Sequence, residues 1–457
     1  MSPVPTLVKS NRGRDKLCHD GFMYVFDRSS SDLTMEFWRC QFKKSCKVRL
    51  HRLIANGEVV KVINSVQSGA PLAVQMEFPS NRVLAKVVNR VRKACASAPA
   101  LPTHRSLIII PEDYAVYEPT PGTSERFLIG DSGLGDDERI LIFGRESVAS
   151  WIGLVDKIYV DGTFSLAPKL FQQVFAVLAE RSGFVVPVCY ALLPNKSQAT
   201  YTRMVELLHQ EWPQFNPMQI SVDFELALVN GFRSVFPNAE INGCLFHLVK
   251  NMKAKLGDIG LIQRYNRDPD FSLSARMIPA LAFVPPAHIN TAMSELAPEL
   301  PEELMPVLNY FEDNYIGRLR LAPGAEIVRA PARFPIAMWS VYQRTVDGEA
   351  RTNNFAEAAH RRLQGEFGVD HPSLWKFIDG IRKVQQSRDV TYARYVAGHN
   401  PEPKRSKYVS ADERILKIVR EFGQRTTVDY LRGLARNFRM QASNSGPQTA
   451  PESSESE

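Results

Sequence analysis

KIYVDGTFSLAPKLFQQVFAVLAERSGFVVPVCYALL, residues 157–193, contains three apolar runs at short intervals. Lys157–Phe164, Phe171–Glu180 and Val185–Leu193 each have the length and the β-branched and aromatic content of a strand. Arg181–Ser182–Gly183 supplies a turn between the second and the third. This segment therefore predicts three consecutive strands.

The residues that follow alternate helix and strand patterns. Apolar side chains at a spacing of three and four predict helices, and short runs rich in β-branched residues predict strands. The predicted elements are a helix over Thr200–Trp212, a strand over Gln219–Asp223, a helix over Glu225–Phe236, a strand over Glu240–Gly243 and a helix over Cys244–Leu256. Their order is that of the ribonuclease-H-like fold, so we expect an α/β core with a mixed sheet flanked by helices.

Two carboxylates stand where strands of this core end. Asp161 ends the first predicted strand and Asp223 ends the fourth, and in a sheet of this order these strands are parallel neighbours. Open α/β sheets bind ligands beyond the carboxyl ends of their strands. Carboxylate oxygens suit magnesium or manganese, and two such ions about 4 Å apart can act on a phosphodiester.

A third acid could come from Arg351–Gln364 (RTNNFAEAAHRRLQ), whose alanine and leucine content predicts a helix. Its N-cap would be one of three residues: Thr352, Asn353 or Asn354. Glu357 then lies early in the helix, and His360 follows on the same face. Two basic residues that could meet DNA phosphates come next: Arg361 and Arg362.

Each of these residues also has a structural interpretation. Asp161 could form a turn with Gly162, Asp223 could cap a helix, and Glu357 could be a solvated helix residue. Cys244 and His247 form a Cys-x-x-His pair that packing alone would explain, because a closed zinc site needs four ligands. His247 could instead orient a phosphate or a catalytic acid. The joint placement of the three acids in the order of this fold favours function.

Composition narrows the class of protein. The chain has 457 residues, 44% hydrophobic and 23% charged, with a net charge of +7, which suits a globular protein that binds a polyanion such as DNA. Its six cysteines are too dispersed for a disulfide framework. The N-terminus has no apolar leader, and the apolar run Phe184–Pro194 is too short to span a bilayer. We expect no membrane partner and no small-molecule substrate.

The sequence divides into four predicted regions. Residues 1–78 predict a small β-rich domain, and residues 141–390 the α/β core. Residues 79–140 contain a basic helix over Arg82–Ala96 and a loop over Thr120–Asp137, in which Gly130, Gly133 and Gly135 have the wrong spacing for a phosphate loop and predict a flexible linker. Residues 391–457 predict one basic helix over Asp412–Arg439 and a disordered acidic end. The basic face of the first helix could be solvated or could bind DNA: Arg82, Lys86, Arg90 and Lys93.

Several motifs of the core resemble the catalytic domain of Mutator-like element (MULE) transposases of the animal type. The matching stretches, in the family's order, are RILIFGRESV from Arg139, DGTF, VPVCYALLPNKS, SVDFELA, GCLFHL and RTNNFAEAAH. The resemblance implies that Asp161, Asp223 and Glu357 are metal-binding acids, and that Cys244 and His247 belong to the architecture of the active site. It also implies a largely helical insertion, here about 257–348, which includes a predicted helix over Glu302–Arg318.

The N-terminus resembles a FLYWCH zinc finger. The matching residues are Ser10, Arg12 and Gly13, the run Gly21–Tyr24, Trp38–Cys40, and Cys46 followed by Val48–Leu50. Cys40 and Cys46 would form half of a zinc site. The family adds a His-x-His about twenty residues later, whereas this chain has no histidine between His51 and His104. We expect the fold to persist and zinc binding to be weak or lost.

Three functions remain open at this point. The first is a transposase, or a protein derived from one, that binds duplex DNA and cleaves and joins it at a divalent metal. The second is a captured, catalytically inactive transposase that regulates through DNA binding. A protein scaffold without a nucleic-acid role is the third, which the basic body and Arg351, Arg361 and Arg362 beside the acids disfavour. A DNA substrate implies nuclear location, and pairing of two DNA ends implies a homo-oligomer.

Overall fold

The computed structural model describes residues 6–9, 15–19, 22–30, 34–40, 49–53, 59–63, 99, 102–321, 327–401, 403, 406–438 and 440. Backbone contacts divide the chain into two units, Met1–Pro99 and Ala100–Glu457. Arg82, Lys86, Arg90 and Lys93 of the predicted basic helix lie outside the described residues, as do Cys46 and the acidic end from residue 441. Among the helices of the described part, none is both long and apolar enough to cross a bilayer.

The N-terminal unit is a β-meander, as its aromatic and β-branched runs predict. Its six strands pair in sequence order, each antiparallel to the next. They are β1 Thr6–Lys9, β2 Asp15–His19, β3 Phe22–Ser29, β4 Met35–Cys40, β5 Arg49–Leu53 and β6 Val59–Ile63. A small core of Leu17, Tyr24, Trp38 and Leu50 holds them together. Burial of these apolar side chains stabilises the sheet.

A seven-stranded mixed sheet forms the centre of the larger unit, in the order β15-β14-β11-β12-β13-β10-β9. The strands are β9 Leu128–Asp131, β10 Leu141–Gly144, β11 Lys157–Thr163, β12 Gln173–Arg181, β13 Phe184–Leu193, β14 Gln219–Val222 and β15 Glu240–Gly243. β11, β12 and β13 form an antiparallel meander, whereas β14 and β15 run parallel to β11. The five strands predicted from the sequence, and the parallel pairing of the first with the fourth, are thus confirmed.

Successive side chains of β11 point alternately into the hydrophobic core and toward the candidate site. Ile158 and Val160 belong to the main hydrophobic core, which also contains residues of α4 (Gln198–Glu211) and α5 (Leu226–Val235). Tyr159 contacts the ring of Phe355 on the opposite face. Because successive side chains of a strand point to opposite faces, Asp161 lies on the same face as Tyr159.

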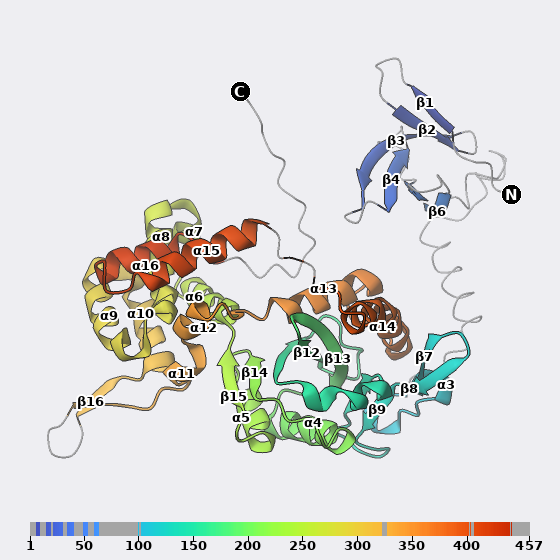
Figure 1. Cartoon of the computed structure of the whole chain (residues 1–457), viewed down its shortest axis with the longest axis horizontal. Coiled ribbons are helices and arrows are strands. Elements are labelled where there is room, and N and C mark those ends of the chain that lie inside the picture. Colours follow the sequence, from blue (N-terminus) through green and yellow to red (C-terminus); the bar gives the residue numbers. More distant parts are fainter. Residues whose placement is uncertain are drawn as a thin grey trace. The chain divides into compact units, whose positions relative to one another are not determined.

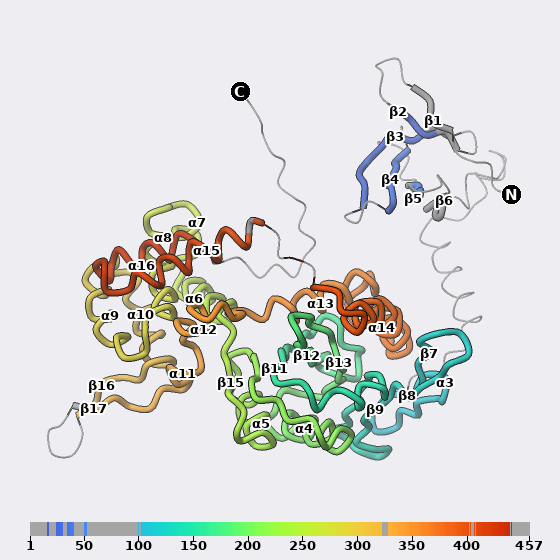
Figure 2. The backbone as a smooth tube through the Cα atoms, viewed as in Figure 1, coloured from blue at the N-terminus to red at the C-terminus, as the bar shows by residue number. Residues whose placement is uncertain are grey.

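Helices cover both faces of the sheet. α4 and α5 lie on one face, and α13 (Asn354–Phe367) and α14 (Leu374–Val396) lie on the other, as Figures 1 and 2 show. The ring of Phe377 in α14 contacts those of Phe367 in α13 and Phe143 in β10. The site that β11 helps to form is therefore bounded by α13.

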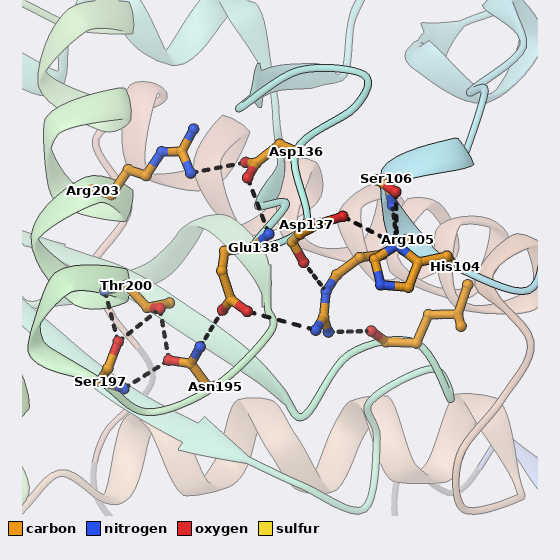
Figure 3. Close-up of polar contacts among 11 residues, drawn as sticks. His104, Arg105, Ser106, Asp136, Asp137, Glu138, Asn195, Ser197, Thr200 and Arg203 are labelled. Carbon is orange, nitrogen blue, oxygen red and sulfur yellow. Dashed lines mark hydrogen bonds and ion pairs between the residues drawn. The ribbon is translucent and has the colours of Figure 1, made fainter.

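The glycine-rich segment before the core is ordered, so the prediction of a flexible linker is wrong. β7 (Val116–Thr120) and β8 (Thr123–Arg126) form a hairpin, and Gly130 lies within β9 of the main sheet. The buried guanidinium of Arg139 binds the carboxylate of Asp131 at 2.7 Å. Asp136 and Glu138 pair with Arg203 and Arg105 (Figure 3). Through these ion pairs, acids of the predicted flexible linker attach it to the rest of the unit.

Most of the segment between β15 and α13 is helical. Besides short 3₁₀ helices, its elements are α6 Leu245–Asp258, α7 Ile262–Arg267, α8 Pro269–Ala280, α9 Ile289–Leu296, α10 Met305–Phe311, the π-helix η8 Glu312–Ile316, the hairpin β16 Leu319–Leu321 and β17 Ile327–Arg329, α11 Ile336–Trp339 and α12 Tyr342–Val346. Helical structure within the predicted Glu302–Arg318 ends at Ile316, because Gly317 adopts a positive φ of 89°.

Two helices at the C-terminus pack against this helical segment, where the sequence predicted a single helix. α15 (Ser406–Arg420) and α16 (Thr427–Ala435) are separated by a turn in which Gly423 has a φ of 84°. The hydroxyl of Tyr430 donates to the carbonyl of Phe283 at 2.6 Å, and Arg276 donates to the carbonyl of Ala435. The two helices, red in Figure 2, thereby join residues far from them in sequence.

Candidate active site

Asp161 and Asp223 lie at the same level of two neighbouring parallel strands. The register pairs Lys157 with Gln219 and Tyr159 with Ser221, and continuing it by two residues brings Asp161 opposite Asp223. The carboxylate of each acid accepts the backbone N–H of the next residue, at 2.9 Å for Asp161 and 2.5 Å for Asp223. The two acids therefore stand at the ends of neighbouring parallel strands, as the strand order predicted.

Asn353 fastens the start of α13 to this edge of the sheet. It is the N-cap of the helix, and its buried side-chain amide donates to the carbonyl of Val160, the residue before Asp161, at 2.8 Å. Its backbone N–H donates to the sulfur of Cys244 at 3.0 Å. Asn354 is instead an exposed first residue of the helix, so its supporting role stays a prediction.

α13 presents His360 and Glu357 to the two strand-end acids. Nδ1 of His360 lies 3.5 Å from the Asp161 carboxylate, and both side chains are largely buried. Glu357 is half-buried in the first turn of the helix, and the charges of Asp161 and His247 act on its carboxyl group. The structure thus brings together Asp161, Asp223, Glu357, His247 and His360.

His247 faces Asp223 from the start of α6. Its Nδ1 lies 3.8 Å from the Asp223 carboxylate, and Cys244, the N-cap of α6, donates its backbone N–H to Val222 at the end of β14. Cys244 also accepts from Asn353, so one cysteine links α6, β14 and α13. Cys244 therefore connects these three elements next to His247 and Asp223.

Burial and nearby charges shift the pKa values of three groups at this site. Burial raises the pKa of Glu357, and Asp161 raises it further, while His247, Arg361 and Lys250 lower it. Burial disfavours the His247 cation, but its hydrogen bond with Cys244 and the charges of Cys244, Asp223 and Asp161 raise its pKa to about 9. Burial lowers the pKa of His360, although Asp161 opposes this. Hydrogen bonding and nearby negative charge thus favour the cation of His247, whereas burial favours the neutral form of His360.

We expect His247 to titrate near pH 9 in the metal-free protein. A folded-state pKa above the usual 6.5 means that the resulting stability is complete below pH 6.5 and disappears as the pH rises through about 9. NMR of ¹³C-labelled histidine would measure the midpoint, with His247→Gln to assign the signal. Cys244→Ala should lower the midpoint, and a wild-type midpoint below 6.5 would contradict the prediction.

The donor chemistry of the acids fits a hard divalent cation. Three carboxylates supply oxygen ligands only, which magnesium and manganese prefer over zinc-type nitrogen and sulfur sets. As they stand, however, no three His, Cys, Asp or Glu side chains in the described part of the chain lie close enough to hold one ion together. A cation at this edge would have to draw the carboxylates inward from their histidine neighbours.

Basic residues flank Glu357 on two helices. Arg361 and Arg362 are exposed on α13, as predicted. Lys250, exposed on α6, also lowers the pKa of Glu357, and it was not singled out from the sequence. Lys250 lies three residues after His247, on the same face of a predicted helix, and this spacing could have identified it.

Phe224 connects the Asp223 loop to the helical insertion. Its ring packs edge-on against Tyr315 and Phe334, with centroids 5.3 and 5.2 Å away. Gly243 makes room for this ring, because a Cβ there would lie 2.7 Å from Cε1 of Phe224. Neither residue could be singled out from the sequence, because their roles depend on contacts with distant segments.

Comparison with known families identifies two segments of the chain. The MULE transposase domain matches residues 157–251, which contain Asp161, Asp223, Cys244 and His247. The FLYWCH zinc finger domain matches residues 7–66. The chain carries a MULE transposase domain and a FLYWCH zinc finger domain. The MULE match ends before Glu357, so the place of this acid rests on the geometry of α13.

Two curated relatives resemble the FLYWCH domain. FLYWCH transcription factor 2 of Caenorhabditis elegans is 33% identical over 70 residues, 15% of this chain and 15% of the relative. FLYWCH transcription factor 1 of the same organism is 36% identical over 59 residues, 13% of this chain and 12% of the relative. The chain thus spans under a sixth of either relative, and the likeness concerns the N-terminal domain alone.

Proposed function

We propose that this protein binds duplex DNA and cleaves and joins its phosphodiesters at a divalent metal, as a transposase or a protein derived from one. The observation that carries the proposal is the convergence of Asp161 and Asp223 on adjacent parallel strands, with α13 anchored beside them through Asn353. Strand order and direction in β11 to β15 support a ribonuclease-H-like core for this site.

In this proposal Asp161, Asp223 and Glu357 hold magnesium or manganese. The ions would activate an attacking oxygen and stabilise the leaving one. His247 and His360 orient the carboxylates of Asp223 and Asp161. Lys250, Arg361 and Arg362 bind the phosphates of the DNA strand, which would otherwise be repelled by the acids.

A cleavage assay with the full chain tests the proposal. Supercoiled DNA is incubated with magnesium, with manganese, or with a chelator, and nicked and linear products are quantified. Products that form only with the metal are expected. DNA binding without any nicking under all three conditions would contradict the catalytic proposal.

DNA binding without nicking would instead support a captured, inactive transposase that acts as a DNA-binding regulator. Two observations favour this alternative. Both curated relatives of the N-terminal domain are named transcription factors. The chain also lacks a histidine between His51 and His104, where a FLYWCH domain completes its zinc site.

Zinc binding by the N-terminal domain is therefore proposed to be weak. Cys40 and Cys46 would supply two ligands, and a stable structural site needs four. Metal analysis of the purified chain should give well under one zinc per chain, and Cys40→Ser should change that content little. One tightly held zinc that is lost on Cys40→Ser would contradict this.

Location and assembly follow from the proposed substrate. Chromosomal DNA places the protein in the nucleus, and joining two DNA ends calls for at least two copies of the site. Light scattering of the DNA complex would measure its mass, and a single copy on paired ends would contradict the homo-oligomer.

A further inference from the structure

Phe164 is an exposed aromatic residue at the edge of the sheet that carries the two strand-end acids. It follows β11 directly, three residues after Asp161, and it is 45% exposed. β11 and β13 are each antiparallel to β12, so they end at the same edge of the sheet. Lys196 follows β13, and its Nζ lies 5.0 Å from the centroid of the Phe164 ring. The ring thus contacts a cation and still leaves nearly half of the residue open to a ligand.

Contacts of Phe164 join the loops that follow the two acids. Lys196 forms an ion pair with Glu225, the N-cap of α5. The backbone N–H of Glu225 donates to the carbonyl of Asp223 at 2.9 Å. The carbonyl of Phe164 accepts the N–H of Ala167 at 3.0 Å, which closes a turn after β11. The ring is therefore held at the edge where Asp161 and Asp223 lie.

The turn after Phe164 is also bound to α13 and to the segment that follows it. The hydroxyl of Ser165 donates to the side-chain carbonyl of Gln364 in α13 at 3.5 Å, and the carbonyl of Ser165 accepts the N–H of His371 at 2.7 Å. Nδ1 of His371 lies 3.1 Å from the carbonyl oxygen of Ala167. Because this turn is already ordered, a ligand that packs on the ring costs little further loss of conformational entropy.

Charge near the ring favours a flat, uncharged ligand. The pair of Lys196 with Glu225 has no net charge, so it attracts phosphates weakly. The cation over the ring is itself attracted to the aromatic face, which keeps the ring in place. What this part of the site offers to DNA is therefore an aromatic surface rather than a charge.

We propose that Phe164 stacks on an unpaired base of the DNA strand that the acids cleave. Proteins bind single-stranded nucleic acid by stacking its bases on aromatic side chains, and every base has a flat face for this contact. A base inside a duplex is covered by its neighbours on both faces, so only a base that has left the stack meets the ring. The inference rests on the proposed function in taking DNA as the substrate, and it names the form of DNA that the site prefers.

Binding of the full chain to two DNA duplexes of equal length tests this inference. One duplex is fully paired, and the other contains a short run of unpaired bases at its centre. The chain carries Asp161→Asn in every measurement, so that the DNA stays uncut in magnesium. The duplex with unpaired bases should bind about tenfold more tightly, as stacking of one base predicts, and Phe164→Ala should abolish this preference.

Two further substitutions at Phe164 distinguish stacking from apolar contact. Phe164→Trp should keep the preference, whereas Phe164→Leu should lose it, because leucine is apolar but has no ring. Leu154→Ala is the control: it removes an apolar side chain that is 63% exposed and precedes the opposite end of β11, and it should leave the preference unchanged. Retention of the preference by Phe164→Leu or Phe164→Ala would overturn the proposal, as would equal binding of the two duplexes by the parent chain.

Self-association and catalysis are separated from base stacking by two more measurements. Light scattering of the free protein should give the same mass with and without Phe164→Ala. A lower mass of the variant with an unchanged preference would assign the ring to contact between copies and overturn the proposal. Metal-dependent cleavage by the wild type without a preference that depends on Phe164 would refute this inference alone. A preference that depends on Phe164 in a chain that never cleaves DNA would refute the catalytic proposal alone.

Discussion

Replacing Asp161 by asparagine is expected to reduce metal-dependent DNA cleavage about a thousandfold or more. The substitution preserves the oxygen that accepts the Gly162 N–H but removes the negative charge that would hold the cation. A bound metal stabilises the transition state by several kcal/mol, and each 1.36 kcal/mol corresponds to a factor of ten in rate. Single-turnover cleavage of labelled DNA measures the loss.

Asp156→Asn is the matched control. Asp156 lies just before β11 on the same chain segment, but its side chain is exposed and stands at the opposite end of the strand from Asp161. The control should cleave like the wild type, and the Asp161→Asn protein should bind DNA at least as well as the wild type. Glu357→Gln should show a loss similar to that of Asp161→Asn. Full activity of either site variant would refute the three-acid site.

Replacing Gly243 by alanine is expected to destabilise the protein by about 1–3 kcal/mol, the range for overpacking a filled interior. The new methyl group would press on the ring of Phe224, which cannot withdraw because Tyr315 and Phe334 pack around it. The displacement would reach Asp223, whose carboxylate accepts the N–H of Phe224. Cleavage should therefore fall even at temperatures where the variant stays folded.

Gly257→Ala provides a control of opposite sign. Gly257 is exposed near the end of α6, and nothing lies within 4 Å of a Cβ placed there. Alanine should stabilise this helix by about 0.5–1 kcal/mol, because glycine loses more backbone entropy on folding. Thermal or urea unfolding of both variants checks the pair. Gly243→Ala unfolding like the wild type would show that Phe224 has room to move.

The ends of the core elements could be predicted within a few residues because their signals are local. Lys157–Thr163, Gln173–Arg181 and Phe184–Leu193 are strands with apolar runs that a single window of sequence reveals. Burial of β12 and β13 on both faces produced those uninterrupted runs. Local patterns failed at the glycine-rich segment, since Arg203 reaches Asp136 from α4.

The sequence by itself determined the order of strands and helices along the core and the position of two acids at strand ends. Hydrophobic periodicity can be read from short windows of sequence, without knowledge of the tertiary structure. Only the tertiary structure decided what holds the predicted helix of Glu357 beside those acids: the buried amide of Asn353 donates to the carbonyl of Val160, 193 residues away in sequence. The tertiary structure likewise decided that α16 packs on α8, which lies far from it in the chain. Contacts between distant segments depend on shape and on partners that no window of sequence contains.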